Sequence, residues 1–383
     1  MRTSAIKFLS TPNKAVFEKV FYRIIVWFNV DFETVDKNKC RNFEFYNIIY
    51  TQTDCEKFGN NIPSSVTSIG EYCFFNCNSL SSVTIQSNVT SIAIGCFCGC
   101  SSLTSITIPF SVISIGDQCF SLCKSLSSIT IPSSVTYIGK GCFHKCDSLS
   151  NVTIPLSIIT IPGMCFRGCN NLSSIIIPSS VNHIGNNCFS ECQNLTCIAI
   201  PSSVTFIDEG CFYKCCRLNI VTISFGVKSI GDKFFFKCGS LRSVILPSSV
   251  TSIGNFCFYK CGALKSITLP SSVTSIGDSC FIYCINLSSV TIPSNVELIG
   301  NQCFKECKSL SNVNLPSYVK SIGDECFSKC NKLSSVKIPK YIKTIGKCCF
   351  NECYNLSNVT IPCSVTLIGN KCFPLKTTIH ISY

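Results

Sequence analysis

A phenylalanine recurs 14 times at a constant interval of 23 residues, from Phe74 to Phe373. An isoleucine column that begins with Ile69 is unbroken over all 14 units, and a leucine column that begins with Leu80 is unbroken over 13. A proline fills 12 of the 14 positions equivalent to Pro63. A unit of this length cannot bury its own apolar face, so successive units must stack and share one core. We therefore expect a repeat solenoid of about 14 units, with residues 62–383 as the repeat domain.

Each unit is expected to contain two short strands and one helical or tight turn. Leu80, Val83 and Ile85 are spaced by three and two residues, which is typical of the strand of a leucine-rich repeat. The proline that usually follows cannot donate a ladder hydrogen bond and so ends the strand. Val66 and Ile69 predict a second extended segment, and the turn after it places the repeated phenylalanine in the core. Connections of this kind are normally right-handed, so we expect a right-handed coil.

The two ends of such a solenoid expose core and strand edges, which natural repeat proteins cover. Residues 1–61 are expected to form a separate N-terminal segment with a capping helix from about residue 12 to 29, because Thr11 and Pro12 suit a helix start and apolar residues then recur at helical spacing. At the other end, apolar and polar residues alternate over residues 377–383. This alternation predicts a C-terminal capping strand.

The composition excludes more functions than it identifies. Charged residues make up 14% of the chain, against about 25% in typical soluble proteins. The net charge of +12 is scattered without an uninterrupted basic run, so no nucleic-acid partner is expected. No apolar stretch approaches the roughly 18 residues of a membrane-spanning helix. The 3 histidines occupy irregular positions and the glycines are dispersed, so we expect no enzyme activity, no metal site and no cofactor.

Cysteine is unusually frequent, since the chain has 33 and 26 of them form two columns that begin at Cys73 and Cys77. Three interpretations are open: buried free thiols that serve as small apolar residues, disulfides, and zinc ligands. Phe234 replaces a cysteine of the first column while Cys238 remains, and Lys376 replaces one of the second. A pair required in every unit would be lost together, and a phenylalanine fits only an interior position. These exceptions favour buried free thiols.

One cluster of side chains is a candidate partner-binding patch. Directly after the repeated phenylalanine, three consecutive units carry an aromatic residue followed by a lysine, namely Tyr213, Lys214, Phe236, Lys237, Tyr259 and Lys260. Stacking would align them into an aromatic row beside a lysine row. Exposed aromatic clusters commonly mark interaction surfaces, and the lysines would favour acidic groups. The alternative is that these rings only cover the outside of the turn. The acidic residues that follow the repeated glycine, such as Asp278, are interpreted as solvated turn residues.

The unit resembles the BspA-like leucine-rich repeats of bacterial and protist surface proteins, whose pattern runs L-x-x-I-x-I/L-P, then V/L-x-x-I-G, then A-F-x-x-C. In one unit the matching residues are Leu126, Ile129, Ile131, Pro132, Val135, Ile138, Gly139, Cys142, Phe143 and Cys146. Cys142 stands where that pattern more often has alanine. The match covers residues 62–373. The resemblance implies a leucine-rich-repeat-like fold and a non-enzymatic protein that binds host or extracellular matrix proteins or other cells. It implies no catalytic residues.

Two functions are compatible with these observations: an adhesive, protein-binding surface protein, and an intracellular protein-interaction scaffold. The resemblance implies the cell surface. The sequence shows no recognisable signal peptide and no lipidation motif, which favours the cytoplasm. The identity of the partner is not readable from the repeats.

Overall fold

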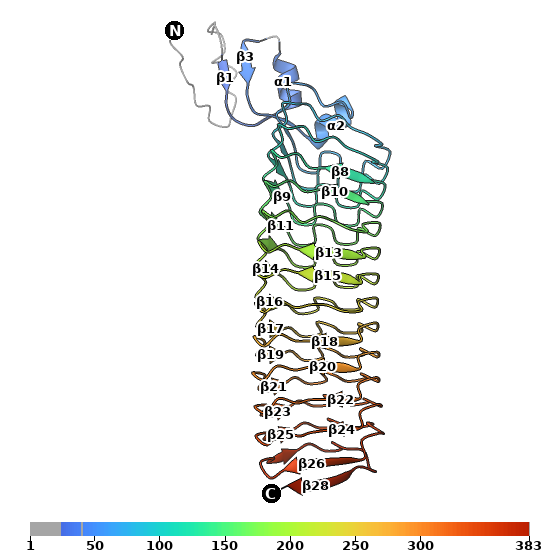
Figure 1. The fold of residues 1–383 in the computed structure, drawn as a ribbon. Helices are drawn as coiled ribbons and strands as arrows, with labels where there is room; N and C mark the ends of the chain where they lie inside the picture. Colours follow the sequence, from blue (N-terminus) through green and yellow to red (C-terminus); the bar gives the residue numbers. More distant parts are fainter. Residues whose placement is uncertain (1–23, 40, 383) are drawn as a thin grey trace.

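The computed structural model describes residues 24–39 and 41–382. These residues form one elongated β-solenoid of about 16 turns, with the irregular N-terminal coils at one end and the C-terminus at the other (Figure 1). The coils lie nearly parallel to one another, so the core is a continuous column rather than a globule (Figure 1).

The first wall of the solenoid is built by the strands that carry the repeated isoleucine. These strands are β5 (Ser68–Ile69), β6 (Ser91–Ile92), β7 (Ser114–Ile115), β9 (Tyr137–Ile138), β11 (Thr160–Ile161), β12 (His183–Ile184), β14 (Phe206–Ile207), β16 (Ser229–Ile230), β17 (Ser252–Ile253), β19 (Ser275–Ile276), β21 (Leu298–Ile299), β23 (Ser321–Ile322), β25 (Thr344–Ile345) and β27 (Leu367–Ile368). Neighbouring strands within a sheet pair in parallel and keep isoleucine opposite isoleucine, as in Ile69 opposite Ile92. The isoleucines are buried in every coil but the last, and the residue before each of them faces outward.

The second wall carries the repeated leucine-containing segment. Its strands are β8 (Ser128–Thr130), β10 (Asn151–Thr153), β13 (Cys197–Ile200), β15 (Ile220–Ile223), β18 (Ser266–Thr268), β20 (Ser289–Thr291), β22 (Asn312–Val313), β24 (Ser335–Val336), β26 (Asn358–Pro362) and β28 (Thr378–Ser382). They pair two by two, in parallel and in register, and isolated bridges such as the one between Thr84 and Thr107 continue the pattern. Inward valine and isoleucine alternate with outward Ser and Thr, because side chains alternate across a strand.

The third side of each coil is a tight turn around the repeated phenylalanine, and no α-helix occurs in the described residues of the regular coils. Two residues of this turn have a left-handed backbone in nearly every coil, as in Tyr72 (φ 52°) and Asn76 (φ 56°). The backbone N–H of Phe74 donates to the carbonyl of Cys96 in the next coil at 2.8 Å. The phenylalanine rings stack along the axis, with Phe74 and Phe97 at 5.1 Å between centroids and 5° between planes.

The cysteines of the second column have a role that the sequence pattern did not reveal. The thiol of Cys100 donates a hydrogen bond to the carbonyl of Phe74 at 3.1 Å, and that of Cys192 to the carbonyl of Phe166 at 3.0 Å. The same contact recurs in consecutive coils up to Cys353. These thiols are therefore donors to the backbone as well as small buried groups. The cysteines of the described residues are all free thiols.

Phe234 shows that the first cysteine column is a packed interior position. Its ring is fully buried and packs edge to face against Phe212 and Phe235, at 78° to each. The expectation that a large apolar side chain fits there agrees with this packing.

The acidic residues after the repeated glycine, such as Asp278, are exposed turn residues as interpreted from the sequence, and they also bind the backbone of the next coil. The carboxylate of Asp278 accepts the backbone N–H of Asn301 at 2.7 Å, and the side-chain oxygen of Asn301 accepts that of Asp324 at 2.8 Å. Asp232 and Asn255 continue this chain of bonds on the other side. We call Asp232, Asn255, Asp278, Asn301 and Asp324 the Asx ladder. It holds successive turns together where no strand does.

Residues 24–39 and 41–61 form two irregular coils that precede the regular ones. They comprise β1 (Ile24–Val26), β2 (Val30–Asp31), α1 (Phe32–Asn38), β3 (Phe43–Phe45), β4 (Ile48–Tyr50) and α2 (Gln52–Phe58). The helix expected over about residues 12–29 lies mostly outside the described residues, and its last part is wrong, because Ile24–Val26 is a strand. Strand β4 pairs in parallel with β5, so the sheet runs through the boundary expected at residue 61. The helices replace the tight turns of the regular coils.

Buried Asp54 joins these two irregular coils. Its carboxylate accepts the backbone N–H groups of Glu33 at 2.8 Å and of Thr51 at 2.8 Å, and Thr51 accepts the Asp54 N–H in return. This reciprocal capping box begins α2 and ties it to α1.

At the C-terminal end, β28 pairs in parallel with β26 over five residues and is exposed along its whole length. Apolar side chains of the last coil remain in solvent there, among them Ile368, Ile379 and Ile381.

Candidate interaction surface

The six residues singled out in the sequence form a continuous stack on the outer side of the tight turns. The rings of Tyr213 and Phe236 lie 4.8 Å apart at 10°, and those of Phe236 and Tyr259 lie 4.5 Å apart at 7°. Each lysine ammonium lies over the ring that precedes it, at 5.1 Å for Lys214 and 5.6 Å for Lys237. We call these six residues, with Tyr283 at their end, the aromatic–lysine ladder.

The backbone fixes the spacing of this ladder. The N–H of Lys214 donates to the carbonyl of Phe236 at 2.7 Å, and the N–H of Lys237 to the carbonyl of Tyr259 at 2.7 Å. Each lysine has a left-handed backbone, with φ of 59°, 60° and 57° for Lys214, Lys237 and Lys260. Gly99 and Gly168 occupy the same position in other coils. The lysines are thus held by the turn in a conformation that glycine adopts at lower cost.

The ladder ends where the repeat changes. Ile282, which follows the phenylalanine in the next coil, is buried, and the aromatic residue is displaced by one position to Tyr283. The ring of Tyr283 therefore meets that of Tyr259 at 83° rather than in parallel. Lys260 lies between them, 5.5 Å from the Tyr259 centroid and 5.1 Å from the Tyr283 centroid.

The rings cover one another's faces by stacking, so the part that remains exposed is the ring edge. Each ring is half-buried. The lysines add positive charge along one side of this row. An edge-on aromatic row beside cations can bury apolar area against a partner and attract acidic groups.

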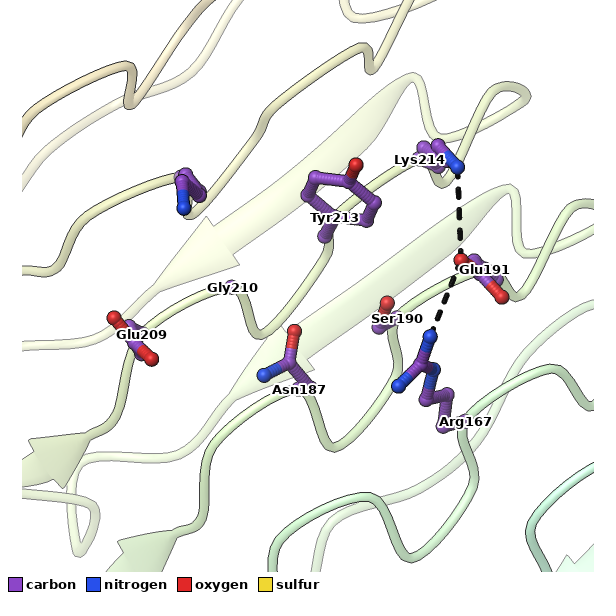
Figure 2. Close-up of a pocket in the computed structure, with 9 residues that line it drawn as sticks. Arg167, Asn187, Ser190, Glu191, Glu209, Gly210, Tyr213 and Lys214 are labelled. Carbon is purple, nitrogen blue, oxygen red and sulfur yellow. Dashed lines mark hydrogen bonds and ion pairs between the residues drawn. The ribbon is translucent and has the colours of Figure 1, made fainter.

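A hollow of about 370 Å³ opens at the other end of the ladder, beside Tyr213 (Figure 2). The hollow exists because two small residues stand where neighbouring coils have large ones. Ser190 stands in the column that holds Arg167 and Tyr213 in the neighbouring coils, and Gly210 stands in the column of Asn187 and Lys233. The absence of large side chains at both positions leaves the space empty. This hollow is not predicted by the repeat pattern, although both small residues are visible in the sequence as departures from their columns.

Charges of both signs surround the hollow. The carboxylate of Glu191 lies 3.5 Å from the Arg167 guanidinium and 3.7 Å from the Lys214 ammonium, as Figure 2 shows. Glu209 and Lys233 also line it. Within this structure the Arg167 Nε and the Ser190 Oγ are buried without a hydrogen-bond partner.

A second feature that was not predicted from the sequence is an exposed apolar strip on the first wall and the turn before it. Six large apolar side chains, each more than half exposed, lie at positions where other coils mostly carry Ser or Thr: Phe110, Ile113, Tyr137, Leu156, Ile159 and Phe206. These six lie within five consecutive coils, and Phe225, Leu298 and Leu367 occupy the same columns in later coils and are also more than half exposed. The signal was available, because each of them breaks the Ser- and Thr-rich pattern of the repeat.

No group of three or more His, Cys, Asp or Glu side chains suited to a metal ion occurs among residues 24–39 and 41–382. Within the same residues, no helix has the length and apolar character needed to cross a bilayer.

The chain belongs to the BspA-type leucine-rich-repeat family. The family model, described as a BspA type leucine rich repeat region of 6 copies, matches residues 38–169, 136–262 and 251–380. The match therefore begins within the irregular N-terminal coils, before the regular 23-residue pattern starts.

Solved structures agree with this assignment. A leucine-rich repeat protein from Bacteroides ovatus is 28% identical, with a TM-score of 0.67 over 90% of this chain and 85% of that one. A leucine rich cell surface protein from Faecalibacterium prausnitzii is 29% identical, with a TM-score of 0.55 over 78% of this chain and 86% of that one. No curated protein sequence matches the chain significantly.

Proposed function

We propose that this protein is a non-enzymatic adhesion scaffold that binds a protein partner through the aromatic–lysine ladder. The observation that carries the proposal is the ladder itself: three stacked rings, each with a lysine ammonium between 5.1 and 5.6 Å from its centroid. The rings supply apolar area that is ordered before binding, and the lysines favour a partner with acidic side chains at the contact. The similarity to a leucine rich cell surface protein supports a role in adhesion at the cell surface.

The left-handed backbone of the three lysines provides a sharp test. Replacing Lys214, Lys237 and Lys260 by glycine removes three charges and relieves backbone strain, so the fold should be retained. We expect binding to an immobilised extracellular matrix protein, measured by surface plasmon resonance, to weaken at least about tenfold. Raising the salt concentration should also weaken binding by the unmodified protein, because salt screens the attraction between the lysines and an acidic partner.

A matched control exists in Lys145, which has the same backbone position in another coil (φ 54°) and lies outside the ladder. Lys237→Gly and Lys145→Gly change the net charge equally. Loss of binding in the first variant but not in the second supports a local contact. Equal effects, or none in the triple variant, would show that the ladder is not the binding surface.

The compartment is tested separately by antibody labelling of intact and permeabilised cells. Labelling of intact cells is the expected result for an adhesion protein. Labelling only after permeabilisation would contradict adhesion and favour an intracellular scaffold, in which the ladder could still bind a partner.

A further inference from the structure

The hollow beside Tyr213 is a site of different chemistry from the ladder. We propose that it binds one sugar ring of a neutral glycan. Its volume of about 370 Å³ lies at the lower end of the range of roughly 300–1,000 Å³ for small-ligand pockets.

The charges around the hollow argue for a neutral ligand. Arg167, Lys214 and Lys233 are balanced in part by Glu191 and Glu209, so three cations face two carboxylates. An incoming carboxylate would meet Glu191, which already occupies the space between Arg167 and Lys214. An incoming cation would meet the three positive groups. A charged ligand of either sign would therefore be repelled by some of the groups that line the hollow.

The hydrogen-bonding groups argue for hydroxyls. Arg167, Lys233 and the Asn187 amide can donate, and Glu209 can accept. A hydroxyl group both donates and accepts, so a ring that carries several of them can pair with such a mixed lining. A peptide backbone presents its donors and acceptors along an extended line, and it would leave more of this compact lining unpaired.

Two buried atoms at the hollow lack partners. Ser190 is only 1% exposed, and its Oγ has no hydrogen-bond partner within the structure. The Nε of Arg167 is also buried without a hydrogen-bond partner in the structure. Buried polar atoms normally find a partner. Both atoms are covered in this structure, so a ligand hydroxyl could accept from the Arg167 Nε–H and pair with the Ser190 hydroxyl once the Arg167 side chain turns aside.

Tyr213 adds an aromatic surface at the same place. Its ring stacks on Phe236 in the following coil. In the preceding coil the equivalent residue is Ser190, which has no ring to stack on it. A sugar ring could take the next place in the row, with its C–H groups against Tyr213. This proposal does not depend on a protein partner at the ladder.

A substitution that fills the hollow tests the site without replacing a residue of the ladder. Gly210 has a φ of 63°, and the equivalent positions of other coils hold Gln118 (φ 52°) and Gln302 (φ 55°), so Gly210→Gln suits the backbone. A Cβ at Gly210 would come within 2.5 Å of the Asn187 Oδ1, which lies at the end of a flexible side chain. The new side chain would fill the hollow.

Gly141→Gln is the matched control. Gly141 holds the same position in a coil outside the hollow, with a φ of 63°, and a Cβ there would come no closer than 3.5 Å to its neighbours. Asn187→Gly serves as a second variant, because it removes the amide at a position with a φ of 53° that glycine tolerates. Circular dichroism and thermal unfolding would establish that all three variants fold.

The full chain would be applied to an array of neutral hexose and N-acetylhexosamine oligosaccharides, sialylated oligosaccharides and a hexaglutamate peptide. The strongest neutral ligand would then be titrated calorimetrically. We expect a Kd on the order of 1 mM for a single ring. Gly210→Gln should weaken binding at least about tenfold, Asn187→Gly should weaken it several-fold, and Gly141→Gln should leave it unchanged.

Absence of neutral-sugar binding by the unmodified protein would overturn the proposal, as would binding that Gly210→Gln does not affect. Binding only of the sialylated sugars or of hexaglutamate, lost in Gly210→Gln, would also overturn it and identify an anion site. Failure of Lys237→Gly to alter protein binding would bear on the proposed adhesion surface alone, because Lys237 does not line the hollow, whereas Lys214 does.

Discussion

At the residue scale, the hydrogen bonds of the second-column thiols explain why the repeat carries cysteine at that position. A thiol is small enough for the core and can also donate to the carbonyl of the preceding coil, as Cys192 does to Phe166 at 3.0 Å. Burial raises the pKa of the Cys192 thiol to about 12, and it raises the pKa of Cys100 to about 12 as well. The thiols are therefore neutral donors at physiological pH and poor nucleophiles.

These raised pKa values predict a loss of stability at alkaline pH. The folded pKa lies above the unfolded value, so the folded state keeps protons that the unfolded state releases once the pH exceeds about 8.5. The contribution is fully present below that pH and is lost as the pH rises towards 12, by about 1.4 kcal/mol per pH unit for each such thiol. Chemical unfolding in the presence of reductant should therefore show stability falling steeply between pH 8.5 and 10.5.

A variant with four of the buried second-column cysteines changed to alanine should show a shallower dependence on pH over the same range. An equal slope in both proteins would mean that the thiols titrate alike in the folded and unfolded states. Stability that rises over this range would contradict the direction of the pKa shifts.

At the element scale, the strands of each coil are too short to hold neighbouring coils together by backbone hydrogen bonds alone. Ladders of side-chain hydrogen bonds supplement them. Strands of two residues, such as β17 and β19, contribute few backbone bonds to a neighbour. The Asx ladder adds a bond between side chain and backbone just past each of several such strands. The repeated Asp and Asn residues are therefore part of the interface between coils.

Asp278→Ala should lower the free energy of unfolding by about 0.5–1.5 kcal/mol, because the Asn301 N–H loses its acceptor. Asp278→Asn should cost less, since the amide oxygen can accept the same bond and Asn alternates with Asp along the ladder. Denaturant unfolding gives the comparison. Ser294→Ala, at an exposed residue, is the control, and a cost for Asp278→Ala no larger than for this control would exclude a structural role of the ladder.

At the scale of the whole molecule, the solenoid behaves as a stack in which each coil contacts only its neighbours. The strands are in register at a shift of 23 residues, as in Ile253 opposite Ile276. A coil can therefore be removed if the coils on either side of it match each other.

Deletion of residues 294–316, one complete unit, should leave a folded protein. Phe281 and Phe327, which now contact Phe304 from opposite sides, would become neighbours. We expect Tm to fall by only a few degrees. Deletion of residues 294–305 removes fewer residues but leaves half a coil without its isoleucine and phenylalanine, and it should abolish cooperative unfolding. A complete-unit deletion that fails to fold would show that the coils are not interchangeable.

The regular core was determined by the sequence alone. An interval of 23 residues, with apolar residues at constant positions, allows only a stack of equal coils, because each position must then meet its own equivalent. The alignment of Tyr213 with Phe236 and Tyr259 follows from the same rule, although their function does not. The packed position of Phe234 also follows, since a large apolar residue can replace a cysteine only inside the core.

Other features depend on the tertiary structure. The N-terminal coils lack the 23-residue pattern, and the pairing of β4 with β5 shows that they continue the solenoid. The thiol and Asx hydrogen bonds join residues of different coils, with directions that a periodic pattern does not specify. The hollow arises where Ser190 and Gly210, 20 positions apart, come to lie side by side. Periodicity fixes which residues stack, but the shape and polarity of a surface depend on how unlike side chains meet across neighbouring coils.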